Sequence, residues 1–193
     1  RYEIPYYQYE KGLLRADGKP GFKSPTGRVE LWSTVKNHLG EDPLPYYEEP
    51  RFSKRSRPEW AEKYPLEFVT GARRATSFHT EHRMIDSLRE IRKYATVEIN
   101  PTTAERYGIH QGDWVKIENP WGACEMVADV TPIVKEDVIG CDHGWWYPEE
   151  KDSELFGVWK SNINELMPWK EIGKLGLGSH YGALPCKISR AEG

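Results

Sequence analysis

Apolar positions in the C-terminal two thirds of the chain fall into short runs. Three continuous runs each predict a short buried strand: residues 66–70, 97–100 and 138–141. Apolar residues at every second position over residues 114–130, with the turn Asn119-Pro-Trp-Gly122 in the middle, predict a hairpin. A last strand is expected over residues 186–189. Strands this short, joined by tight turns, favour a small closed barrel, because closure removes exposed strand edges.

Two short helices are expected between these strands. Ser87 and Glu90 match a capping box, so the first helix is predicted to have its cap at Ser87. Asn100 is suited to cap the second helix, and Gly108 is suited to end it. The predicted fold class is therefore mainly β with short helices.

Residues 1–60 have a different pattern, rich in Tyr, Pro and Gly. A turn that leads into a short strand is expected over residues 25–33, and the charged block at residues 51–57 predicts a basic, exposed link. We interpret residues 1–60 as an irregular lead-in or linker from a preceding domain. The compact domain is predicted to occupy residues 61–193.

Composition excludes several classes of function. A net charge of -3 over 193 residues provides no global basic field, so nucleic acid is not an expected partner. No apolar run has the length needed to cross a bilayer, so no direct membrane insertion is expected. The three cysteines form no C-x-x-C pair and are interpreted as small buried hydrophobes.

The chain starts at Arg1 and shows neither a signal peptide nor a twin-arginine leader. We therefore expect it to be a piece of a longer polypeptide. Its compartment stays open between a prokaryotic cytoplasm and export through a leader located elsewhere.

Polar and aromatic side chains gather in four loops next to predicted strands: residues 71–83, 142–149, 159–166 and 178–185. The first loop carries Arg73, Arg74 and Arg83, whose fork-shaped donors match phosphate oxygens. Gly71 allows the backbone to approach a ligand closely. The alternatives for this loop are an anion-holding strand end and a solvated basic loop.

Three further features of these loops bear on metal binding and on contacts with a ligand ring. His79 and His82 would share one face of a helix, but zinc needs three or four ligands, so hydrogen bonding to an anionic or heterocyclic ligand is favoured over a metal. The two tryptophans of residues 143–146 either close a barrel end or form a flat wall beside a ligand ring. Asn162 and Asn164 would share one face of a strand and present amides to one ligand.

The order of the motifs is more specific than any one of them. The chain resembles the C-terminal part of the large molybdopterin-dependent oxidoreductases, the dimethyl sulfoxide reductase superfamily. The resemblance rests on motifs in the following order: F-K-S-P-T-G-R-V-E-L-W-S (22–33), Y-P-L-E-F-V-T-G-A-R-R (64–74), F-H-T-E-H-R (78–83), V-E-I-N-P-T-T-A-E-R-Y-G-I-H-Q-G-D-W-V-K-I (97–117), H-G-W-W (143–146), S-N-I-N-E-L (161–166) and A-L-P-C-K-I (183–188).

The resemblance implies a double-psi β-barrel that binds bis-molybdopterin guanine dinucleotide with molybdenum or tungsten. It implies cofactor contacts, and neither catalytic nor metal-ligating residues, at the following positions: Gly71, Arg73, Arg74, Ser77, Phe78, His79, His82, Arg83, His143, Gly144, Trp145, Asn162, Asn164, Tyr181 and Gly182. The segment G-S-H-Y-G departs from many relatives, which puts Ser179 and His180 in doubt.

The resemblance also implies an enzyme that moves an oxygen atom, or electrons and protons, on a small substrate. The fragment alone is not expected to be catalytic. Its expected partners are earlier domains of the same polypeptide with an iron-sulfur cluster, an iron-sulfur electron-transfer subunit and a membrane anchor. One alternative is hydration or hydroxyl transfer, because H-G-W-W-Y-P-E is similar to acetylene hydratase-like members. The other alternative is a stand-alone binding barrel.

Overall fold

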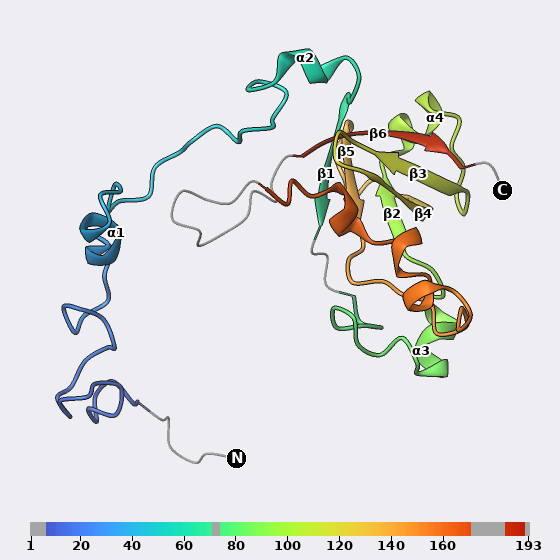
Figure 1. The fold of residues 1–193 in the computed structure, drawn as a ribbon. Coiled ribbons are helices and arrows are strands. Elements are labelled where there is room, and N and C mark those ends of the chain that lie inside the picture. The colour runs from blue at the N-terminus through green and yellow to red at the C-terminus, as the bar shows by residue number, and fades with distance from the viewer. Residues whose placement is uncertain (1–6, 71–73, 171–183, 192–193) are drawn as a thin grey trace. The chain divides into compact units, whose positions relative to one another are not determined.

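The computed structural model describes residues 7–70, 74–170 and 184–191, and the chain divides into two compact units, Arg1–Glu48 and Glu49–Gly193 (Figure 1). In the first unit, helix α1 (Thr34–His38) is capped by Ser33, whose hydroxyl accepts from the Lys36 N–H. The strand expected within residues 25–33 is wrong. The chain turns there instead, held by the Glu30 carboxylate, which accepts hydrogen bonds from Thr26 and Thr34.

The described part of the second unit contains six strands that close into a barrel in the order β1-β5-β2-β4-β3-β6 (Figure 1). Their bounds are β1 (Leu66–Thr70), β2 (Thr96–Ile99), β3 (Trp114–Glu118), β4 (Ala123–Val130), β5 (Val138–Cys141) and β6 (Leu184–Arg190). The pairs β1–β5 and β2–β4 are parallel, and the other neighbouring pairs are antiparallel. The predicted fold class, mainly β with a closed barrel and short helices, is confirmed.

Helix α2 (Pro58–Ala61) precedes β1, and the segments between the strands contain α3 (Asp86–Ile91), α4 (Pro101–Arg106) and the 3₁₀ segments η1 (Glu154–Lys160) and η2 (Ile163–Leu166). Helix α4 follows the prediction, since the Asn100 side chain accepts from the Thr102 N–H and Gly108 has φ +62°. The capping box at Ser87 is wrong. Helix α3 begins at Asp86, so Ser87 already lies inside its first turn and cannot cap it.

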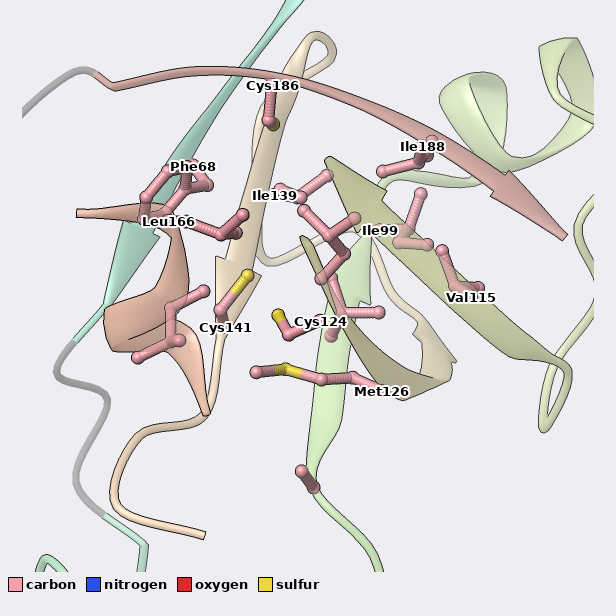
Figure 2. Close-up of a cluster of buried hydrophobic side chains, with 14 of the residues drawn as sticks. Phe68, Ile99, Val115, Cys124, Met126, Ile139, Cys141, Leu166, Cys186 and Ile188 are labelled. Atoms are coloured by element: carbon pink, nitrogen blue, oxygen red, sulfur yellow. The ribbon is translucent and has the colours of Figure 1, made fainter. Parts of the chain in front are cut away.

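The core fills the inside of the barrel (Figure 2). In β3 and β4, alternate residues point inward, which explains the period of two in the sequence. Cys124, Cys141 and Cys186 are all buried, as predicted, and burial raises the pKa of Cys124 to about 12. A thiol inside this barrel therefore stays neutral and acts as a small hydrophobe.

The segment expected to be an exposed link is partly buried. Phe52 is 6% exposed and stacks on Trp60, and both rings contact Trp121 edge-on. The prediction considered the charged residues of the block and overlooked the apolar ring among them. No helix in the described ranges is long and apolar enough to cross a membrane.

Candidate functional site

The parallel pairing of β1 with β5 brings the first two predicted loops together. Thr70 pairs with Cys141 at the ends of these strands, so the loop after β1 and the loop after β5 leave the barrel side by side. In Figure 1 both segments lie beyond the same end of the barrel, near α3. Residues that are about 70 positions apart in the chain thereby form one junction, which we call the loop junction (residues 74–83 and 142–147).

Arg74 lies at the base of the loop junction in a buried ion network. Its Nε donates to Asp142 Oδ1 at 2.7 Å, and its Nη1 donates to Glu98 Oε1 at 2.7 Å. The other oxygen of Asp142 accepts from the Thr96 N–H at 2.9 Å and forms an ion pair with Arg92 at 3.3 Å. Two cations and two carboxylates are thus matched in charge within one cluster.

The electrostatics of Arg74 follow from this pairing. Burial alone would lower its pKa, but the hydrogen bonds and negative charges of Asp142 and Glu98 outweigh burial and raise the pKa. Sequence reasoning missed both carboxylates as site residues. Glu98 carried a usable signal, because it is the charged residue in the otherwise apolar stretch of β2.

Arg83 lies at the other end of the first loop and has a different environment. It is 3% exposed, and its guanidinium carbon lies 3.7 Å from the centre of the Trp145 ring. Its Nη2 donates to the carbonyl of His79 at 3.0 Å and approaches the carbonyls of His143 and Gly144 at 3.5 and 3.4 Å. Burial lowers the pKa of Arg83 to about 10, and the negative charge of Asp142 only partly offsets this. Arg83 therefore fastens one loop to the other.

Further contacts hold the two loops against each other. His143 Nε2 and His79 Nδ1 are 3.0 Å apart and share a hydrogen bond. The Trp146 indole N–H donates to the Thr80 carbonyl at 2.8 Å. Gly144 has φ +62°, and a Cβ there would lie 2.9–3.1 Å from backbone atoms of His79 and Thr80. A side chain at residue 144 would clash with this backbone, so the close contact between the two loops requires glycine there.

The remaining predicted residues of the first loop lie nearer the surface. The segment is not a helix but a series of turns, in which Arg74 and Ser77 form one isolated bridge and Phe78 and Glu81 another. Phe78 is 53% exposed. His82 is exposed, at φ +72°, and lies 3.9 Å from a Glu81 oxygen.

The third loop is placed differently from the prediction. Asn162 and Asn164 are not on a strand. Asn162 caps η2 and accepts from the Asn164 N–H at 3.1 Å, because the turn brings residues two apart into capping distance. The loop is tied to the junction through Ser161, whose hydroxyl lies 2.6 Å from the Tyr147 hydroxyl.

Several predicted contacts lie outside the described residues: Gly71, Arg73, Tyr181 and Gly182, together with Ser179 and His180. Among the residues that the structure does describe, no group of three or more His, Cys, Asp or Glu side chains is arranged to hold a metal ion.

A cavity of about 830 Å³ opens beside the loop junction. Met84, Trp146, Pro148 and Phe156 provide its apolar lining, and Arg83 contributes from the junction. Its charged lining residues are Asp86, Arg89, Glu90, Lys93, Glu149 and Lys151. The indole that borders this cavity is Trp146, not the predicted Trp145, which is 1% exposed and covered on one side by Arg83.

Buried hydrogen-bond donors without a partner indicate which kind of ligand the loop junction can bind. Within the described ranges, the buried atoms of the first two loops without a hydrogen-bond partner include Arg74 Nη2, Thr76 Oγ1, Arg83 Nε and Trp145 Nε1. Three of them can only donate, and the threonine hydroxyl can donate as well. A buried donor without an acceptor costs about 1–3 kcal/mol. The junction therefore fits a ligand rich in acceptor oxygens and ring nitrogens.

Comparison with known proteins agrees with this chemistry. Residues 66–176 match the family described as "Molydopterin dinucleotide binding domain". The match runs from β1 through both loops of the junction and the third loop.

Individual relatives extend the similarity to most of the chain. The chain is 42% identical to a dopamine dehydroxylase from Eggerthella lenta over 84% of its own length and 18% of that protein. It is 34% identical to the acetylene hydratase of Syntrophotalea acetylenica over 68% of its length and 18% of the relative. The solved acetylene hydratase from Pelobacter acetylenicus matches with a TM-score of 0.80 and 28% identity, over 92% of this chain and 25% of that one. The chain thus spans about a fifth of the curated relatives it matches.

Proposed function

Because this chain belongs to the molybdopterin dinucleotide-binding domain family, we propose that it holds bis-molybdopterin guanine dinucleotide in a larger enzyme. The metal is molybdenum or tungsten, and the enzyme transfers an oxygen atom, or electrons and protons, on a small substrate. The chain binds and orients the cofactor, and the metal and pterins of the cofactor supply the redox chemistry.

The unpaired donors of the loop junction carry this proposal. The Arg83 Nε, the Trp145 indole N–H and the Thr76 hydroxyl suit a ligand with pyrophosphate oxygens and pterin or guanine ring acceptors. The adjacent cavity adds an apolar wall from Trp146 and Phe156, which lie edge to face with ring centres 5.7 Å apart. Such a surface accommodates a flat ring.

Removal of single donors tests the proposal without changing the shape of the site. In the intact protein, Trp145→Phe removes the indole N–H, and Thr76→Val removes the hydroxyl. Each lost donor to a bound ligand costs about 1–3 kcal/mol, so we expect the cofactor affinity to fall about 5- to 150-fold. Guanine nucleotide released by acid, per polypeptide, measures the cofactor retained.

The controls are Trp114→Phe in β3 and Thr102→Val in α4, which make the same chemical changes away from the loop junction. They should retain the cofactor of the parent protein. If the junction variants retain as much guanine nucleotide as the controls after extended dialysis, the unpaired donors do not bind the cofactor.

A second candidate keeps the same cofactor but performs hydration or hydroxyl transfer. The similarity to acetylene hydratase, found both by sequence and by structure, favours it. The two candidates differ in their need for electrons. Turnover by the intact protein without any electron donor or acceptor supports hydration, and strict dependence on a reductant or oxidant supports the redox enzyme.

The chain spans only about a fifth of its curated relatives, which supports further domains of the same polypeptide as partners. We propose that earlier domains of the same polypeptide carry an iron-sulfur cluster and the protein ligand of the metal. An iron-sulfur electron-transfer subunit and a membrane anchor are further proposed partners. The complete gene and the subunits that co-purify with its product test both statements.

A further inference from the structure

Of the three arginines of the first loop that were predicted to contact the cofactor, Arg74 and Arg83 lie within the described residues, and their hydrogen-bond partners differ. Arg74 has Nε and Nη1 engaged by carboxylates, its third nitrogen, Nη2, is buried without a partner, and its side chain is only 16% exposed. We propose that Arg74 is a positioning residue, which anchors the first loop to β2 and to the start of the second loop, and that it does not supply the positive charge that binds the cofactor. The proposal refines the cofactor site and rests on the proposed function for its binding readout.

The geometry of Asp142 provides the first argument. This residue is 2% exposed, follows β5 directly and precedes His143. One of its oxygens accepts a hydrogen bond from Arg74 of the first loop, and the other accepts hydrogen bonds from the N–H and the hydroxyl of Thr96 at the start of β2. Its own N–H donates to the Thr96 carbonyl at 3.0 Å. Arg74 is thus bound to the residue from which the second loop departs.

The geometry of Glu98 provides the second argument. Glu98 pairs with Gly140 across β2 and β5, and a Cβ on Gly140 would lie 2.6 Å from Glu98 Oε2. The absence of a side chain at residue 140 leaves the space in which the carboxylate extends to Arg74. The strands β2 and β5 and both loops therefore contribute to the placement of one guanidinium group.

Charge provides the third argument. Arg74 and Arg92 balance Asp142 and Glu98, so no net positive charge is left in this cluster for an anion. If Arg74 is replaced by a neutral residue, one buried carboxylate loses its counter-ion, which would both loosen the loop and repel an anionic cofactor. Neutralising Glu98 as well should then restore cofactor binding and the order of the two loops.

This reasoning leads to a charge-compensation experiment on the intact protein. Arg74→Gln alone should lower the released guanine nucleotide about tenfold, and Arg74→Gln with Glu98→Gln should recover most of it, because the two substitutions together remove one positive and one negative charge of a coupled pair. Asp113→Asn is the control, since Asp113 pairs with an arginine, Arg190, away from the loop junction, and it should release as much guanine nucleotide as the parent protein.

Amide hydrogen exchange supplies a readout that does not depend on the cofactor. In Arg74→Gln, the amides of residues 77–83 and 142–144 should exchange about tenfold faster, while those of the β3–β4 hairpin stay unchanged. The compensated double variant should return toward the parent rates. Both results together support a positioning role.

The opposite outcomes are equally defined. A loss of nucleotide in Arg74→Gln with unchanged exchange in both loops, and without recovery on adding Glu98→Gln, would make Arg74 a direct contact and overturn the proposal. Unchanged exchange and unchanged nucleotide would also overturn it. If the parent protein releases no guanine nucleotide, the proposed function fails, and the exchange rates alone then decide whether Arg74 positions the loop.

Discussion

The barrel interior and the base of the loop junction both contain buried side chains, but the chemistry of those side chains is opposite. Inside the barrel, side chains such as Met126, Ile139 and Cys141 are neutral and have no exposed surface (Figure 2). At the junction, Arg74, Asp142 and Arg83 are charged and almost as well covered.

The difference shows what each region is built for. An interior without charge needs only shape and apolar area, so it can be filled by any side chains of suitable volume. A buried charge costs several kcal/mol unless it has a partner, so each charged group at the junction restricts its neighbours to particular atoms. The junction therefore holds two loops in one arrangement, and the interior supports the strands from which they emerge.

The largest expected effect comes from removing the carboxylate on which the junction depends. Asp142→Ala leaves Arg74 and Arg92 without their shared partner, so we expect a loss of about 3–5 kcal/mol in the free energy of unfolding. Asp113→Ala, at a more exposed pair, should lose about 1 kcal/mol or less. Urea unfolding measures both. Equal losses would mean that the junction charges matter no more than surface pairs.

A second prediction compares two glycines with the same backbone angle. Gly144 and Gly108 both have φ +62°, but only at Gly144 would a Cβ meet backbone atoms within 3.1 Å. Gly108→Ala should cost about 1–2 kcal/mol from the left-handed conformation alone. Gly144→Ala should cost about 1–3 kcal/mol more, because the two loops must separate to admit the methyl group.

The measurement is thermal unfolding of both variants, combined with amide exchange at Thr80. If Gly144→Ala costs no more than Gly108→Ala, the loops are not packed against each other as closely as the structure shows.

The smallest expected effect is the dependence of the free energy of unfolding on pH, which comes from a thiol in the barrel interior. Burial raises the pKa of Cys124 from 9.0 to about 12, so the unfolded chain releases this proton at a lower pH than the folded one. The stabilisation is complete below pH 9 and is lost as the pH rises toward 12. Between pH 9 and pH 10 the parent protein should lose about 1 kcal/mol more than Cys124→Ala. Denaturant unfolding at both pH values checks this slope, and parallel pH profiles would contradict the neutral-thiol interpretation.

The predictions from sequence succeeded where the pattern is local. The strand bounds of β1 and β5, the β3–β4 hairpin and the start of α4 all follow from residues next to each other in the chain. They failed where a competing contact decided the outcome. The α3 cap is an example, since Ser87 has the right chemistry for a cap but lies two residues after the N-cap position, Ile85. Asn162 and Asn164 are another, since the chain forms η2 there and one amide is used to cap it.

By itself, the sequence determined the alternation that builds the barrel, the family to which the chain belongs and the loops that carry polar side chains. The tertiary structure alone decided how those loops are used. The parallel pairing of β1 with β5 places Arg74 beside Asp142 and His79 beside His143, although 68 and 64 positions separate them. Whether an arginine faces a ligand or a carboxylate depends on these long-range neighbours, because a charge is neutralised by whatever lies within a few ångströms in space, and no short-range pattern in the chain records that distance.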